Sequence, residues 1–324
     1  MKPLGRGILR RMALRIALFG QAAFGRDTLE RLLEDGHRVV GVFAPPEGSR
    51  PDALSERAEE LGIPLVRRRY YRKKTGEVIP AAVAAYRMLD AELNVLASVQ
   101  VFLPSEIVDA PKHQSICFHP SLLPKYRGGA AMQWQIIDGV AETGVSIFVP
   151  DQGFDTGPIL LQKGGVKLDP SETTASLFFD KLHPLGVEAI VETVEKIDAG
   201  TAQPVPQDEA SATHQPLVDD SIAAIVLSRG AQEIDRLVRG CDPQPGAFIR
   251  VAGKRVRLYD ARLEAEAAGE PGEILSIDAT GLRLALKGGV LRIGRVRADM
   301  AKEAASAFAA RVGLSSGDRV EGGA

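Results

Sequence analysis

The alternation of short apolar segments with amphipathic helical segments constrains this chain more than any other feature. Apolar runs occur at residues 15–20, 39–43, 93–96, 115–118 and 145–149, and helical spacing occurs at residues 28–33, 53–61 and 78–89. Strands that are apolar along their whole length are typical of sheets covered on both faces. Their alternation with helices predicts an α/β fold, a Rossmann-like, doubly wound and mostly parallel sheet.

The chain has 324 residues, enough for two domains. We expect a first domain over residues 13–203, with a long helix at 173–197 that kinks at His183 and Pro184. Residues 204–220 are rich in Pro, Ser, Thr and Gln, and predict a linker. A helix at 222–238 and short runs with Gly turns predict a small OB-like β-barrel over 221–312. We expect a flexible extension at 1–12, with the start at Met1 or Met12 left open, and a disordered tail at 313–324.

The bulk composition limits the class of protein. Apolar residues make up 45% and charged residues 25%, as in ordinary globular proteins, and the net charge of −2 gives no general attraction to nucleic acid or membranes. Two distant cysteines cannot form a disulfide framework, so a cytoplasmic location is expected. No apolar run is long enough for a membrane span. The histidines and cysteines lack metal-ligand spacing, and we expect no metal.

His119 and Asp155 form the strongest candidate catalytic pair. His119 ends the apolar run at 115–118, and Asp155 lies in a turn-rich stretch after the run at 145–149. Ligands of open α/β sheets bind at the carboxyl ends of strands, where two such groups would provide acid/base catalysis. Alternatively, the histidine is structural and the aspartate satisfies a turn. Cys117 would share the face of His119, either as a thiolate nucleophile or as a small core residue.

Three other features have weaker implications. Residues 20–25 follow the first strand but lack the middle glycine of a dinucleotide-binding loop, so a tight strand-to-helix turn is expected. Residues 67–74 contain six basic residues and two tyrosines, which suit either nucleic acid, a polyanionic cofactor tail or a solvated loop. Trp134 lies in an apolar segment and is expected in a core.

Four motifs make the chain resemble the formyltransferase superfamily that uses 10-formyltetrahydrofolate. They are H-P-S-L-L-P-x-x-R-G at 119–128, T-G-V-S-I-F at 143–148, D-x-G-x-D-T-G at 151–157 and I-L-L-Q at 159–162. Within it, residues 91–96 and 102–107 most resemble the hydrolase domain of 10-formyltetrahydrofolate dehydrogenase. The resemblance implies that His119 binds the formyl oxygen or protonates the leaving nitrogen, and that Asp155 deprotonates the nucleophile. It places the folate near Leu96, Ala97, Ser98, Gln100, Val149, Asp151, Gly153 and Phe154.

The formyl acceptor is left open by the resemblance. Water would make the chain a hydrolase that releases tetrahydrofolate and formate, whereas an amine on methionyl-tRNA or on an amino sugar would make it a transferase. The stretch at 44–55 carries little positive charge, unlike the basic loop of methionyl-tRNA formyltransferases, so tRNA is not favoured. The family asparagine is replaced by Cys117, which removes one donor to the formyl oxygen and leaves a weakly active folate-binding protein as a third hypothesis. The chain ends before an aldehyde dehydrogenase domain would begin, so NADP-linked oxidation is not expected.

Overall fold

The computed structural model describes residues 13–99, 101–264, 266 and 268–323. These residues form two compact units. One boundary, between Ala212 and Thr213, falls within the expected linker at 204–220, but two earlier segments of the chain also belong to the second unit. The first unit contains residues up to Arg127, with Gly144–Gly164 and His183–Ala212. The second contains Gly128–Thr143, Gly165–Leu182 and the residues from Thr213 onward. Among the described residues, we find no helix with the length and apolarity needed to span a bilayer.

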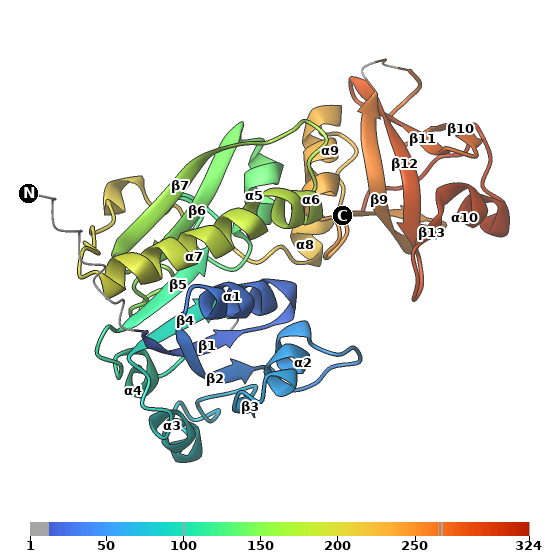
Figure 1. Ribbon diagram of the computed structural model, residues 1–324. Helices are drawn as coiled ribbons and strands as arrows, with labels where there is room; N and C mark the ends of the chain where they lie inside the picture. The colour runs from blue at the N-terminus through green and yellow to red at the C-terminus, as the bar shows by residue number, and fades with distance from the viewer. Residues whose placement is uncertain (1–12, 100, 265, 267, 324) are drawn as a thin grey trace, which may run out of the picture. The chain divides into compact units, whose positions relative to one another are not determined.

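A seven-stranded sheet in the order β3-β2-β1-β4-β5-β6-β7 organises the N-terminal half of the chain, as Figure 1 shows. The contiguous strands β3, β2, β1, β4 and β5 pair in parallel, and β6 pairs antiparallel with β5. The predicted doubly wound, mostly parallel sheet is therefore confirmed. The strands are β1 (Arg15–Gly20), β2 (Arg38–Ala44), β3 (Leu65–Arg67), β4 (Leu93–Ala97), β5 (Ser115–His119), β6 (Glu142–Phe148) and β7 (Ile159–Lys167).

Helices cover the buried strands of this sheet. Phe19 and Phe43 stack with their ring centroids 4.4 Å apart, beside Tyr86 of α3. Phe24 of α1 contacts Phe118 of β5, with ring centroids 4.5 Å apart. The second of these contacts packs α1 against β5, which ends at His119. The helices are α1 (Ala22–Glu34), α2 (Ala53–Glu60), α3 (Pro80–Arg87), α4 (Ser105–Val108) and α7 (His183–Asp198).

The long helix expected at 173–197 is interrupted near the predicted kink. It consists of α6 (Thr174–Ser176), a π-helix at Leu177–Leu182 and then α7. Pro184 has no backbone N–H and would crowd the carbonyl one turn earlier, so an unbroken α-helix is unfavourable there.

The second unit contains the antiparallel sheet expected of a small barrel domain. Its strands follow the order β10-β11-β12-β9-β8, with β13 paired to β12. The prediction of one helix at 222–238 is wrong in extent. A short helix ends at Ala223, the next residues are not helical, and a second helix begins at Ala231 with Gly230 as its N-cap. The elements are α5 (Ala131–Asp138), α8 (Asp220–Ala223), α9 (Ala231–Gly240), β8 (Phe248–Val251), β9 (Lys254–Glu264), β10 (Ile274–Asp278), β11 (Gly281–Leu286), β12 (Gly289–Arg297), β13 (Glu303–Ala304) and α10 (Ala305–Val312). Trp134 of α5 packs, partly buried, against the core of this unit.

The expected disorder of residues 313–324 is wrong for residues 313–323. Glu321 pairs with Arg250 of β8, and Arg319 pairs with Glu273 beside β10. Val320 is buried in the core of the unit. The tail therefore supplies backbone partners to both edge strands of the antiparallel sheet, an arrangement that its Gly-rich composition did not indicate. Expected features at residues 1–12 and at Ala324 lie outside the described residues.

We expect Gly20→Ala to destabilise the first unit strongly. A Cβ at Gly20 would lie 2.5 Å from the backbone oxygen of Ala97, which cannot move without disturbing β4. The expected cost is about 1–3 kcal/mol in the free energy of unfolding. Thermal and urea unfolding of Gly20→Ala and of the control Gly48→Ala, which has open space around it, measure this. Equal stability of the two variants would contradict the close approach of Gly20, at the end of β1, to the Ala97 oxygen of β4.

Candidate functional site

His119 is positioned by the end of β5 and by the loop that follows it. Its Nε2 lies 2.8 Å from the backbone oxygen of Tyr126. Because a carbonyl oxygen only accepts, Nε2 must carry a proton and donate it. The side chain is 7% exposed, and burial lowers the pKa of the His119 imidazole, while Asp155 and the Tyr126 carbonyl act in the opposite direction. Neutral His119 therefore has its free lone pair on Nδ1.

Asp155 reaches His119 from the loop between β6 and β7. The sequence had suggested that the strands carrying the two residues end at the same edge of the sheet. They do not, because β6 is antiparallel to β5. The loop returns instead, closed by a 2.9 Å hydrogen bond from the Val149 N–H to the Pro158 oxygen. Asp155 has φ +56°, the left-handed conformation that reverses the chain. The returning loop brings the two predicted catalytic residues together.

The imidazole of His119 and the carboxylate of Asp155 face each other, and a single hydrogen can lie between them. His119 Nδ1 lies 3.5 Å from Asp155 Oδ2, and the Asp155 side chain is 23% exposed. Neutral Nδ1 and an ionised carboxylate are both acceptors, so this contact favours states in which a proton, or a ligand hydrogen, lies between them. The pair can therefore accept a proton from a bound molecule and return it elsewhere.

Cys117 lies two residues before His119, but its environment opposes a thiolate. Its Sγ donates weakly to the Phe118 oxygen at 3.7 Å. Burial raises the pKa of the Cys117 thiol, and the Asp155 carboxylate raises it further. A thiol that stays protonated is a poor nucleophile, so the core-packing interpretation of Cys117 is favoured.

The residues expected near a folate lie in β4, just after it, and in the loop that carries Asp155. Leu96 and Ala97 are buried in β4, and Leu96 pairs with Cys117. Ser98 follows them with φ +64°. Asp151 accepts hydrogen bonds from the Gly153 N–H and the Thr156 hydroxyl, so it organises the loop. Val149 closes the loop as described above, and Gln100 lies outside the described residues.

Phe154 contributes an exposed aromatic surface next to Asp155. It is 64% exposed and packs edge-to-face against Phe102, which is 52% exposed, with ring centroids 4.6 Å apart. Two large exposed rings at one place form an apolar patch of the kind that often marks a ligand-binding surface.

Arg127 and Gln207 are site residues that the sequence interpretation missed. Arg127 is fully buried and donates to the side chains of Gln207 and Glu209. Gln207 in turn donates to the backbone oxygens of Asp155 and Gly157. Gln207 lies in the expected linker, whose composition hid this role, and Arg127 stands in the 119–128 motif without any signal of its partners. Residues 204–212 therefore form part of the first unit rather than a passive connection.

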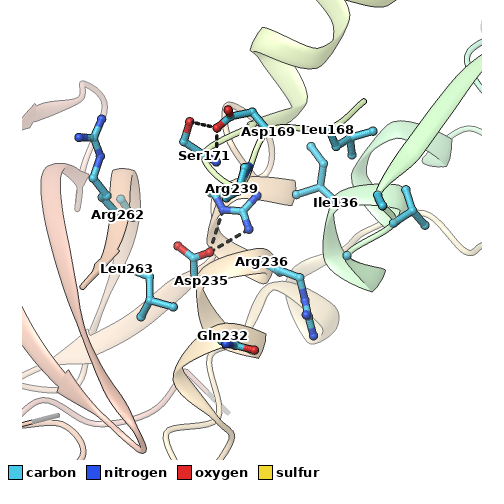
Figure 2. A pocket seen from close by; sticks show the side chains of 15 residues that line it. Ile136, Leu168, Asp169, Ser171, Gln232, Asp235, Arg236, Arg239, Arg262 and Leu263 are labelled. Atoms are coloured by element: carbon cyan, nitrogen blue, oxygen red, sulfur yellow. Dashed lines mark hydrogen bonds and ion pairs between the residues drawn. The ribbon is translucent and has the colours of Figure 1, made fainter. Parts of the chain in front are cut away.

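A cavity of about 810 Å³ lies in the second unit, apart from this pair of residues. Its lining comes from α5, α9, β9 and the 168–171 segment, as Figure 2 shows. The central charges are mutually satisfied, since Arg239 Nε donates to Asp235 at 2.8 Å and Asp169 accepts from Ser171. Neither His119 nor Asp155 lines it, so its size does not make it the catalytic site.

The basic run at 67–74 is partly neutralised. Arg67 pairs with Glu47 and Glu59, and Lys73 pairs with Glu77. Tyr71 is buried in the aromatic core, so only Tyr70 presents an exposed ring. Arg67 and Lys73, two of the six basic residues of the run, therefore have acidic partners within the protein.

The geometry defines an α/β protein in which His119 and Asp155 lie side by side, together with a second unit that contains an antiparallel sheet. A sequence profile of the formyl transferase family matches residues 14–194, and one of the formyl transferase C-terminal domain matches residues 219–312. The chain belongs to the formyl transferase family, as its motifs had suggested.

Two characterised relatives illustrate the range of this family. The chain is 39% identical over 272 residues to the human mitochondrial 10-formyltetrahydrofolate dehydrogenase, covering 83% of this chain and 29% of that protein. It thus spans well under half the length of the dehydrogenases that it matches. It is 33% identical over 315 residues to the methionyl-tRNA formyltransferase of Geobacter metallireducens, covering 95% of this chain and 98% of that one.

Solved structures share the fold. HypX from Aquifex aeolicus in complex with tetrahydrofolic acid matches with a TM-score of 0.70 and 20% identity, covering 92% of this chain and 47% of that one. An N-formyltransferase from Helicobacter canadensis, in complex with folinic acid and dTDP-3-aminofucose, matches with a TM-score of 0.66 and 17% identity, covering 86% and 98%.

Proposed function

We propose that this chain cleaves the formyl group of 10-formyltetrahydrofolate, with water as the acceptor and tetrahydrofolate and formate as products. The observation that carries the proposal is the 3.5 Å approach of His119 Nδ1 to Asp155 Oδ2 in a member of the formyl transferase family. Water is favoured over an amine because the chain is 39% identical to a 10-formyltetrahydrofolate dehydrogenase over 83% of its length.

The chemistry follows from the two titratable groups. Asp155 Oδ2 takes a proton from water as the water oxygen bonds to the formyl carbon, and the formyl oxygen becomes an oxyanion. The proton passes to His119 Nδ1, because His119 Nε2 is committed to Tyr126. Collapse of the oxyanion breaks the bond between carbon and N10, and His119 Nδ1–H protonates N10. The released formic acid then loses its proton to solvent and leaves as formate. General acid–base assistance of this kind contributes about 10²–10⁴ in rate.

The folate would occupy the surface expected from the sequence. Its flat rings suit the exposed Phe102 and Phe154 pair, and its pterin suits the backbone groups after β4 and in the 149–158 loop. The remaining expected contacts are Leu96, Ala97, Ser98, Val149, Asp151 and Gly153. We also propose a cytoplasmic location, which the free thiols of Cys117 and Cys241 support.

Transfer to methionyl-tRNA is the second candidate, because the match to a methionyl-tRNA formyltransferase covers 98% of that enzyme. One assay separates the candidates. The protein is incubated with 10-formyltetrahydrofolate alone, with charged initiator tRNA, or with a nucleotide-linked amino sugar, and tetrahydrofolate release is followed by absorbance. Release with water alone supports the proposal. Release only with tRNA or the amino sugar replaces water by that acceptor, and no release under any condition refutes formyl cleavage.

We expect Cys117→Ser to retain most of the formyl-release rate. The thiol is held protonated by burial, so it contributes packing rather than a nucleophile. Steady-state rates of Cys117→Ser and wild type, with circular dichroism to verify folding, measure this. Complete loss of turnover in a folded Cys117→Ser variant would restore the nucleophile hypothesis.

A further inference from the structure

Asp155 adopts a backbone conformation that needs support from its surroundings. Its φ of +56° is uncommon for a residue with a side chain, and such conformations persist when neighbouring contacts determine them. The side-chain amide of Gln207 supplies these contacts. Its Nε2 donates to the Asp155 oxygen at 2.8 Å and to the Gly157 oxygen at 2.7 Å. One amide thus holds the loop on both sides of Thr156.

Arg127 determines which way this amide points. The Nε and Nη2 groups of Arg127 donate to Gln207 Oε1 at 3.1 and 2.8 Å. Guanidinium N–H groups cannot accept, so Oε1 must face Arg127 and Nε2 must face the loop. Arg127 is itself fixed by two hydrogen bonds to Glu209, of 2.9 and 2.7 Å. The amide therefore has its two donors and its acceptor satisfied in one orientation.

Val205 anchors the segment that carries Gln207. Val205 and Ile159 exchange backbone hydrogen bonds of 2.8 Å in both directions, at the start of β7. Gln207 thus approaches the loop from a segment that is already tied to the sheet. Fixed donors of this kind hold a catalytic group without reorganisation during the reaction.

Arg127 is also connected to His119, through the neighbouring backbone carbonyl of Tyr126. Arg127 follows Tyr126 directly, and the Tyr126 oxygen accepts the proton of His119 Nε2. Immobilising Arg127 therefore restrains the carbonyl that orients the imidazole, while Gln207 restrains the carboxylate. Besides His119, the Asp155 carboxylate interacts electrostatically with Cys117 and Arg127. Arg127 also interacts with Glu209 and Asp151.

We propose that Gln207, oriented by Arg127, is a positioning residue that sets the distance between His119 Nδ1 and Asp155 Oδ2. This inference deepens the proposed function and rests on it only for the activity readout. A displacement of about 1 Å in a reacting group can cost about 10²-fold in rate. Without its two donors, the loop relaxes and the carboxylate moves away from the imidazole.

Two substitutions at Gln207 separate this role from a merely structural one. Gln207→Met keeps the length but removes the donors and the acceptor. Gln207→Glu keeps an acceptor for Arg127 but cannot donate to Asp155 or Gly157. If Gln207 only satisfied Arg127, Glu would restore function and Met would not. If it positions Asp155, both variants lose function. Gln133→Met, which removes an exposed amide that donates to the Gln244 oxygen, is the matched control.

The first readout is the pKa of His119, which NMR titration of the whole 324-residue chain measures independently of any turnover. Asp155 raises this pKa, so its displacement lowers it. We expect Gln207→Met to shift the pKa of His119 toward the value in Asp155→Asn, and Gln133→Met to leave it unchanged. The second readout is formyl release, for which kcat falls about 10²-fold in Gln207→Met and Gln207→Glu with little change in KM.

The outcomes distinguish the two proposals. Suppose that Gln207→Met lowers the pKa of His119 but that the wild-type protein releases no tetrahydrofolate. This result supports the positioning role and refutes the proposed function. An unchanged His119 pKa and unchanged kcat in a folded Gln207→Met variant overturn the positioning role and leave the proposed function intact. Full activity in Gln207→Glu alone also overturns it, since the donors to the loop would then be unnecessary.

Discussion

Asp155→Asn is expected to lower the rate of tetrahydrofolate release by about 10²–10⁴-fold, because an amide cannot take the proton of the attacking water. The substitution keeps the size of the side chain. It also removes the negative charge that raises the pKa of His119, so the acid limb of any residual activity should move to lower pH. Steady-state rates between about pH 5 and 8 test both effects.

The chain provides a matched control in a second His/Asp pair. His183 Nε2 lies 2.8 Å from Asp27 Oδ2, at the contact between α7 and α1 and outside the catalytic loop. Asp27→Asn should lower stability without altering kcat, since this pair touches no reacting atom. Equal loss of activity in Asp27→Asn and Asp155→Asn would indicate a general structural effect and contradict the assignment of Asp155.

His119→Ala is expected to lower the rate by a comparable factor of about 10²–10⁴. Without the imidazole, N10 leaves unprotonated, and the proton taken by Asp155 has no route to it. His113→Ala is the control, because His113 precedes β5 and lies outside the pair. Circular dichroism and rates of both variants are compared with wild type. A folded His119→Ala variant with near-normal turnover would remove His119 from the mechanism.

Much of the fold could be predicted because its strands are apolar along their whole length. The apolar runs that form β1, β2, β4 and β5 are buried on both faces, and continuous apolarity is the sequence pattern of such strands. The antiparallel direction of β6 was not predictable in this way. Local apolarity is the same for either direction, and the direction depends on the connection through residues 120–141 and on the pairing of Cys117 with Phe148.

The sequence indicated His119 and Asp155 as a pair, and the structure places them 3.5 Å apart, but the residues that hold them in place were not predicted. His119 and Asp155 are titratable groups in short, turn-rich motifs, so their chemistry is visible locally. Gln207 is 52 residues from Asp155, in a Pro-rich segment that resembles a linker, and its contact is a hydrogen bond to a backbone oxygen. Such contacts leave no periodic pattern, and the ordered tail at 319–321 escaped prediction for the same reason.

A double-mutant cycle on His119 and Asp155, with release of tetrahydrofolate from 10-formyltetrahydrofolate in water as the readout, tests the central claim most directly. If the two side chains pass one proton between them, either substitution disables the same step. We predict measurable release by wild type, and equal residual rates in His119→Ala, Asp155→Asn and the double variant. Release that falls in the double variant by the product of the two single effects would show that the residues act independently and contradict the account.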